Sequence, residues 1–103
     1  MSNTSYNRVD TLKEFNELKL PMVIISETEN NVTTYIGFVP GIELKKITSL
    51  SVDTCKSNLL KETKSKVKEM IENELPFPFF PTKEEIMEDF ENVCYIKFLN
   101  VKK

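Results

Sequence analysis

A stretch of helical periodicity between residues 53 and 75 constrains the fold of this chain more than any other feature. Pro76 ends the stretch, because proline disfavours the α conformation at the preceding Leu75. Asp53 or Thr54 is expected to cap its start. The pattern predicts a long helix laid on a sheet, with an apolar face that spans about 160° at about 100° per residue and is formed by Cys55, Leu59, Leu60, Thr63, Val67, Met70 and Ile71.

Three strands are predicted before this helix. Residues 22–25 form a short run rich in β-branched side chains, and residues 32–39 follow after a turn whose asparagines tolerate positive φ. Gly37 inside the second strand predicts a bulge or a close backbone approach. Pro40-Gly41 has the residue order of a type II turn, and after a charged stretch a third strand is expected over about residues 47–52.

An extended crossover, a short helix and a final strand are predicted after the long helix. Three prolines in the seven residues 75–81 exclude a regular helix or a central strand there. Thr82 and Glu85 have the spacing of a capping box, which predicts a helix over about residues 83–90. Residues 93–101 have the composition of a closing strand.

These elements predict an α+β domain with the order β-β-β-α-(short α)-β. One mostly antiparallel sheet of about four strands carries the long amphipathic helix on one face. The domain is expected over residues 19–103. Residues 1–18 are expected to be an N-terminal extension, in which residues 10–18 have the pattern of a short helix.

The inventory of reactive side chains argues against an enzyme. The chain has no histidine, the commonest general base and metal ligand, and its two cysteines are too few for a zinc cage. A two-metal nuclease needs about three or four converging carboxylates, whereas the pattern offers only Glu27 at a strand end and Asp53 at the helix start. We therefore predict no catalytic residue, no metal site and no cofactor.

The cysteines and the first residues bear on the compartment. Cys55 and Cys94 lie in apolar-patterned stretches and are expected to be reduced thiols of the core. Residues 1–10 are polar and lack the apolar core of a signal peptide, and no run is long enough to span a membrane. We expect a cytoplasmic protein that does not act at a membrane.

Lysines gather in and before the long helix. Residues 45–68 hold seven lysines against two acidic residues, and Lys61, Lys64 and Lys68 share one edge of the helix. No aromatic residue or arginine is interleaved with them, so the pattern is more typical of a solvated flank than of a nucleic-acid site. Weak RNA binding or nuclease activity is a third hypothesis, and DNA binding is not expected.

Both faces of the predicted sheet carry apolar side chains. In the last strand Cys94, Ile96 and Phe98 alternate with Tyr95 and Leu99. One long helix covers one face, so the second face needs the N-terminal helix, a second copy of the chain or another partner. We expect a second copy, which would make the protein a dimer or a larger homo-oligomer.

Phe77, Phe79 and Phe80 form an aromatic group in the crossover. An extended chain is expected to hold Phe77 and Phe79 on one side and Phe80 on the other. Either these rings pin the crossover onto the sheet, or they anchor another chain, as aromatic residues do at interfaces.

Acidic residues cluster on the short helix and just after it. The ordinary interpretation is a solvated face whose charge favours the start of the helix. The alternative is a contact surface for a partner or a second copy, with Glu84, Glu85 and Glu88 as the candidate residues.

The order of the elements and two short motifs resemble the HicB-like antitoxin family over about residues 20–101. Val39-Pro40-Gly41 matches part of the family's proline-glycine turn, and Asp53-Thr54 matches its helix-opening Asp-Thr pair. The crossover at 76–81 and the closing strand look like the same family's ending. The resemblance covers the N-terminal-type domain only, and no C-terminal DNA-binding domain is expected.

The resemblance implies a truncated ribonuclease H-like fold without its catalytic carboxylates. Such a protein acts by contact, by covering the RNA-binding and catalytic surface of a small HicA-type ribonuclease toxin. Since that toxin binds RNA it would be basic, and residues 84–91 are then the expected steering surface. The alternative is an orphan homo-oligomeric protein, regulatory or structural, without a toxin partner.

Overall fold

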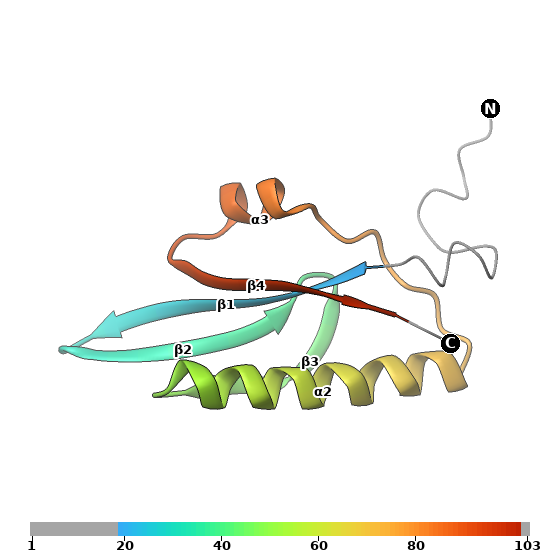
Figure 1. Ribbon diagram of the computed structural model, residues 1–103, viewed down its shortest axis with the longest axis horizontal. Helices are drawn as coiled ribbons and strands as arrows, with labels where there is room; N and C mark the ends of the chain where they lie inside the picture. The colour runs from blue at the N-terminus through green and yellow to red at the C-terminus, as the bar shows by residue number, and fades with distance from the viewer. Residues whose placement is uncertain (1–18, 102–103) are drawn as a thin grey trace.

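Four antiparallel strands form the centre of the structure, with one helix on each side of the sheet (Figure 1). The computed structural model describes residues 19–101. The sheet order is β3-β2-β1-β4. The predicted α+β class and the predicted order of the elements are confirmed. These elements are β1 (Lys19–Glu29), β2 (Val32–Val39), β3 (Ile42–Ser49), α2 (Val52–Glu72), α3 (Lys83–Asp89) and β4 (Val93–Asn100).

Strand β1 is longer than predicted. It begins at Lys19, and the short helix predicted for residues 10–18 lies outside the described residues. It continues past residue 25 because its polar second half pairs with β2 as far as the β1–β2 turn. Asn30 and Asn31 make this turn at φ 53° and 68°, the positive values predicted for them.

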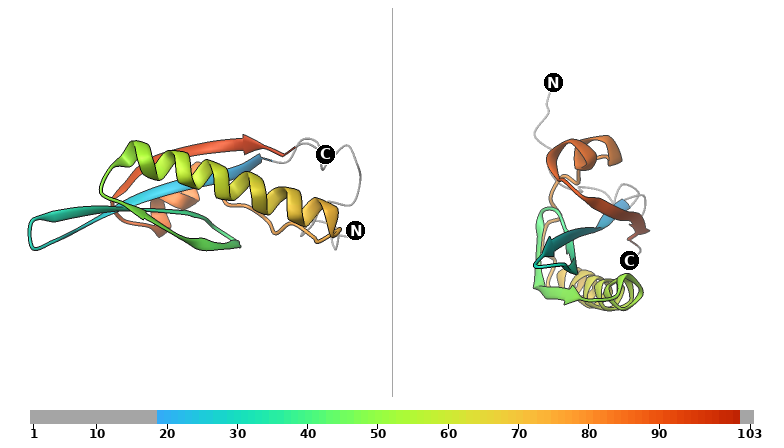
Figure 2. Two further views of the ribbon diagram at one scale, coloured as in Figure 1. Left: turned by 90° about the horizontal axis from the view of Figure 1, so that it is seen from below. Right: turned by 90° about the vertical axis from the view of Figure 1, so that its left-hand side faces the viewer.

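The end of the β1–β2 hairpin extends beyond the rest of the sheet (Figure 2). β4 pairs with β1 only as far as Val93 opposite Ile25, and β3 pairs with β2 only from Ser49 opposite Tyr35. In the described part of the chain, residues 27–34 therefore form a two-stranded ribbon with no neighbouring strand on either edge.

Strand β3 begins earlier than predicted. The two-residue turn Pro40-Gly41 reverses the chain at once, so the strand starts at Ile42, opposite Val39. The charged residues 43–46 therefore lie within the strand and not before it. An edge strand tolerates these charges because one of its sides faces solvent, while Leu44 packs against the core.

Helix α2 packs on the face of the sheet that holds the main core. At Gly37 of β2 the helix comes so close that a Cβ would lie 3.3 Å from both Cys55 Sγ and Leu59 Cδ2. The close approach predicted at Gly37 is therefore present. The pairing of β2 with β3 also shifts register between Gly37 and Val39, but the extra residues lie in β3 and not at Gly37. Leu60, predicted on the apolar face, is exposed. Each large aliphatic side chain buried here contributes about 1.5–3 kcal/mol, and the helix buries Cys55, Leu59, Thr63, Val67 and Met70.

The start of α2 differs from the prediction. Its N-cap is Ser51, whose side-chain oxygen accepts a hydrogen bond from the Thr54 N–H at 3.4 Å. The N–H of Ser51 donates in turn to Ser49 Oγ at 3.1 Å, which helps to fix the cap. Asp53 and Thr54 lie in the first turn, so the prediction that one of them caps the helix was wrong.

The end of α2 is set before Pro76 is reached. Glu74 adopts a left-handed conformation with φ 55°, and the Leu75 N–H donates to the Met70 carbonyl at 2.9 Å. This is the Schellman arrangement that commonly ends helices, and glycine is its usual left-handed residue. The helix therefore stops at Glu72, and Pro76 only prevents its continuation.

Helix α3 covers part of the opposite face of the sheet (Figures 1 and 2). Ile86 of α3 and Val23 of β1 are fully buried, and the rings of Phe38 and Phe90 lie 4.9 Å apart. The sequence predicted the N-terminal helix, a second copy or another partner as the cover of this face, whereas α3 covers part of it. The sequence of α3 contains few apolar residues, so its packing on the sheet was hard to predict. Ile86 and the following Phe90 make its contacts with this face.

Candidate partner-binding site

Two phenylalanines pin the crossover between α2 and α3 to the domain. Phe77 is 3% exposed and belongs to the main core, and the ring of Phe80 lies 6.5 Å from the Phe77 ring. The prediction that Phe77 and Phe79 share a side was wrong. Phe77 pairs with Phe80, which is the three-residue repeat of a polyproline II chain rather than the two-residue repeat of a strand.

The crossover passes directly over the β2–β3 turn. Gly41 has φ 90°, and a Cβ on it would lie 3.0 Å from Pro78 Cγ. Both the turn and the close approach therefore require glycine at this position. Val39 before the turn is buried. The family-like turn thus helps to place the crossover.

Phe79 lies between the anchored rings of the crossover and is 68% exposed. Because Phe77 and Phe80 are packed, the backbone on both sides of Phe79 is fixed. An aromatic ring held in solvent by such a backbone loses little conformational entropy when it contacts another molecule. Of the three predicted aromatic residues, Phe79 is therefore the contact candidate, while Phe77 and Phe80 pin the crossover.

Helix α3 starts with the predicted capping box. The Glu85 N–H donates to Thr82 Oγ1 at 3.2 Å, and the Thr82 N–H donates to Glu85 Oε1 at 2.9 Å. Ile86 buries one side of the helix. The candidate residues Glu84, Glu85 and Glu88 are all exposed around the other side.

A groove of about 410 Å³ lies between the crossover and α3. Of the candidate residues, Phe79, Phe80 and Glu85 line this groove. Glu84 and Glu88 do not. Asp89 completes the site; it belongs to the steering surface expected at residues 84–91 but was not among the candidate contact residues. Its spacing of four residues from Glu85 is the signal that could have found it. The groove is lined by Phe79, Phe80, Pro81, Glu85 and Asp89.

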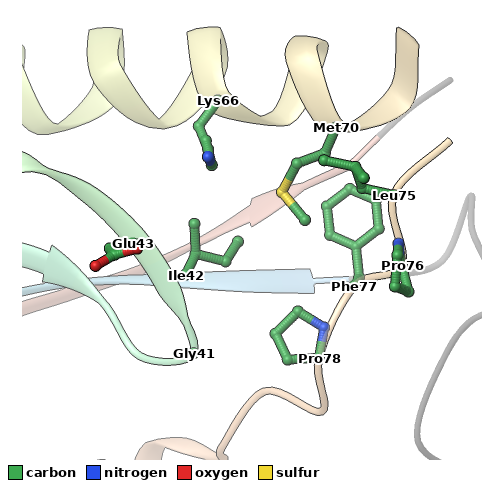
Figure 3. A pocket seen from close by; sticks show the side chains of 9 residues that line it. All are labelled: Gly41, Ile42, Glu43, Lys66, Met70, Leu75, Pro76, Phe77 and Pro78. Carbon is green, nitrogen blue, oxygen red and sulfur yellow. The ribbon is translucent and has the colours of Figure 1, made fainter. Parts of the chain in front are cut away.

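A second groove, of about 540 Å³, lies where the crossover leaves the end of α2 (Figure 3). Figure 3 shows the Phe77 ring and the Met70 side chain beside each other, with Lys66 and Glu43 further along the groove. Its walls are otherwise apolar and continue into the core. The lining residues are Gly41, Ile42, Glu43, Lys66, Met70, Leu75, Pro76, Phe77 and Pro78.

The two cysteines occupy different environments. Cys55 is buried, and burial raises the pKa of its thiol, with a further increase from the Cys94 thiol. Cys94 is exposed and donates to the Ile24 carbonyl at 3.4 Å. The prediction of a core thiol was wrong for Cys94, because β4 shifts its register against β1 beside Ile24 and disturbs the alternation of its side chains.

Between residues 19 and 101, no group of three or more cysteine or acidic side chains is placed to hold a metal ion. In the same range, no helix is long and apolar enough to cross a membrane. Lys61, Lys64 and Lys68 are exposed on α2, away from the groove beside α3.

In comparisons with known proteins, no family model, no curated protein and no solved structure matches the chain. The resemblance to the HicB-like family therefore rests on the element order, the turn and the helix start. Function has to be inferred from the geometry of the crossover, α3 and the groove between them.

Proposed function

We propose that this chain is a non-enzymatic interaction module of the HicB-like antitoxin kind. It binds a small HicA-type ribonuclease and covers the surface with which that enzyme holds and cleaves RNA. The observation that carries the proposal is the exposed Phe79 ring beside the acidic helix α3. The ring supplies an interface anchor, and the helix supplies charge that a basic partner would meet.

The charge of α3 and the next residues suits an RNA-binding partner. Residues 83–91 hold five acidic residues against Lys83. An enzyme that binds RNA neutralises phosphates with lysine and arginine, so its active surface is positively charged. An acidic surface then accelerates the encounter with that enzyme and competes with RNA for the same side chains.

Inhibition of ribonuclease activity tests this proposal. The probe is the purified HicA-type ribonuclease that the proposal expects to be encoded next to this chain, and the absence of such a gene would count against the proposal. We expect the wild-type chain to block RNA cleavage at equimolar concentration. The double substitution Phe79→Ala and Glu88→Gln should weaken the inhibition roughly tenfold or more, because an interface anchor and a complementary charge are lost.

A matched control separates the site from general effects on the surface. Leu50 is 72% exposed and lies between β3 and α2, away from the groove. Leu50→Ala should inhibit like the wild type. A chain that leaves RNA cleavage unaffected at every concentration would contradict the proposal.

A homo-oligomer without a toxin is the second candidate, and one observation favours it. Ile25, Ile36 and Phe98 remain only half-buried on the α3 face of the sheet. A second copy that covers them would bury additional apolar surface. Light scattering at micromolar concentration tests this candidate, and a monomeric mass would contradict it.

A further inference from the structure

We propose that the groove between the crossover and α3 receives an arginine side chain of the partner protein. The guanidinium would lie against the Phe79 ring and donate hydrogen bonds to the carboxylates of Glu85 and Asp89. The partner's identity rests on the proposed function, whereas the chemistry of the groove is argued from the groove itself.

The lining of the groove combines an exposed ring with two carboxylates, and none of the described residues that line it is basic. Glu85 and Asp89 are four residues apart on α3 and so lie on the same side of the helix. Glu85 uses Oε1 for the Thr82 N–H, which leaves its second oxygen free to accept a hydrogen bond. The groove therefore attracts a cation that can also stack.

An arginine fits this arrangement better than a lysine. Its planar guanidinium stacks on an aromatic face and presents five donors, which can reach both carboxylates. A lysine ammonium makes point contacts and is more strongly hydrated. The chain already uses a cation on a ring elsewhere, since Lys56 Nζ lies 4.7 Å from the Tyr95 ring centroid.

The groove is formed before any partner arrives. One wall is fixed by the packing of Phe80 on Phe77, and the other is fixed by the capping box and by buried Ile86. An arginine entering the groove would therefore order few side chains of this chain. Because its walls are preformed, the groove would hold a cation at one defined position. The acidic helix alone would attract cations without fixing where they bind.

Amide NMR shifts of the labelled full-length chain test the proposal without the partner. The probes are three short capped peptides, identical except for one central arginine, lysine or citrulline. Citrulline has the shape of arginine without its charge. We expect the arginine peptide to shift the resonances of residues 79–89, the lysine peptide to bind several-fold more weakly, and the citrulline peptide to cause no shift.

Two substitutions with the same charge change separate the groove from the acidic surface. Asp89 lines the groove, whereas Glu84 does not. Asp89→Asn should weaken binding of the arginine peptide several-fold, and Glu84→Gln should leave it nearly unchanged. Phe79→Leu keeps an apolar side chain but removes the aromatic face, and it should also weaken binding.

Several results would overturn the proposal. They are equal effects of Asp89→Asn and Glu84→Gln, equal binding of the arginine and lysine peptides, or shifts that spread to Glu27 and Glu29 at the hairpin. Inhibition of the ribonuclease that survives both Asp89→Asn and Phe79→Leu would also reject this groove, while leaving the proposed function intact. Specific arginine binding by a chain that inhibits no ribonuclease would reject only the proposed function.

Discussion

Helices α2 and α3 cover opposite faces of one sheet in different ways. α2 has 21 residues and buries five of them, whereas α3 has 7 residues and buries Ile86 alone. α2 packs the side chains of Cys55 and Leu59 against Gly37, while α3 is anchored by buried Ile86 and by the Phe38–Phe90 contact beside it. The α2 face therefore contributes most of the buried core, whereas the α3 side leaves an aromatic ring and acidic side chains exposed.

The difference shows how few residues a short helix must bury to stay on a sheet. Ile86 anchors α3 and the capping box fixes its first turn, so the other residues of the helix remain exposed to solvent. Changes at Phe79 or on the acidic side of α3 are therefore expected to affect binding more than folding. Changes on the inner side of α2 are expected to affect folding first.

The largest effect is expected from shortening a buried side chain of α2. Leu59 and Ile86 are both 0% exposed, so they allow a direct comparison of the two faces. Leu59→Ala should lower the free energy of unfolding by roughly 3–5 kcal/mol, and Ile86→Ala by roughly 2–3 kcal/mol. The cost should be smaller at Ile86 because a short helix can shift to close the cavity. Urea unfolding followed by circular dichroism measures both values.

Amide hydrogen exchange shows which elements lose stability in each of the two variants. Leu59→Ala should speed exchange throughout the sheet and α2, whereas Ile86→Ala should speed exchange mainly in α3. Equal and global effects of the two substitutions would show that both faces belong to one cooperative core, and the comparison would fail.

Loss of a helix cap should have a smaller and more local effect. Thr82→Ala removes the capping box of α3 and should cost about 1 kcal/mol of local stability. Exchange of the α3 amides should become faster while urea unfolding of the sheet changes little. Ser51→Ala is the matched change in α2, and it should lower global stability instead because α2 unfolds with the core.

Removal of an unpaired buried hydroxyl should stabilise the α2 face. Thr63 is 1% exposed, and its Oγ1 has no hydrogen-bond partner among the residues that the structure describes. Thr63→Val keeps the shape and removes the desolvated hydroxyl, so thermal unfolding should show a gain of up to about 1 kcal/mol. Thr63→Ser keeps the hydroxyl and loses the methyl group, so it should destabilise the protein. A loss of stability in Thr63→Val would indicate a bridging water.

The smallest effect concerns pH at the start of α2. The pKa of the Cys55 thiol is raised in the folded protein by burial and by Cys94. As the pH rises through the ordinary thiol range, the unfolded chain therefore loses this proton first, and the folded state loses stability. Urea midpoints across this range should fall more for the wild type than for Cys55→Ala. Parallel curves would contradict the burial argument.

The elements whose causes are local could be predicted from the sequence. Helical periodicity identified α2, the Thr82 and Glu85 spacing identified the start of α3, and paired asparagines identified the β1–β2 turn. In each case, a few neighbouring residues determine the backbone. Glu85 and Phe79 were also among the candidate residues, Glu85 within the acidic cluster and Phe79 within the aromatic group of the crossover. The sequence left open which of the three rings is exposed.

The predictions were wrong where contacts between residues far apart in the sequence determine the structure. The charged residues at the start of β3 were predicted to form a loop. They fit a strand because β3 lies at the edge of the sheet, and that position depends on the strand order. Cys94 resembled a core residue because the register shift beside Ile24 arises from pairing with β1. The groove itself needed the pairing of Phe80 with Phe77 and the placement of α3 on the second face. No local pattern contained that information.

The free end of the β1–β2 hairpin offers a practical use. Residues 27–34 contact neither β3 nor β4 as strand partners, and the turn at Asn30 and Asn31 lies far along the hairpin from the body of the domain (Figure 2). Extra residues at such a tip are tolerated better than elsewhere in a sheet. A fluorophore or an affinity tag inserted there would report on the molecule while leaving both helices and the groove untouched.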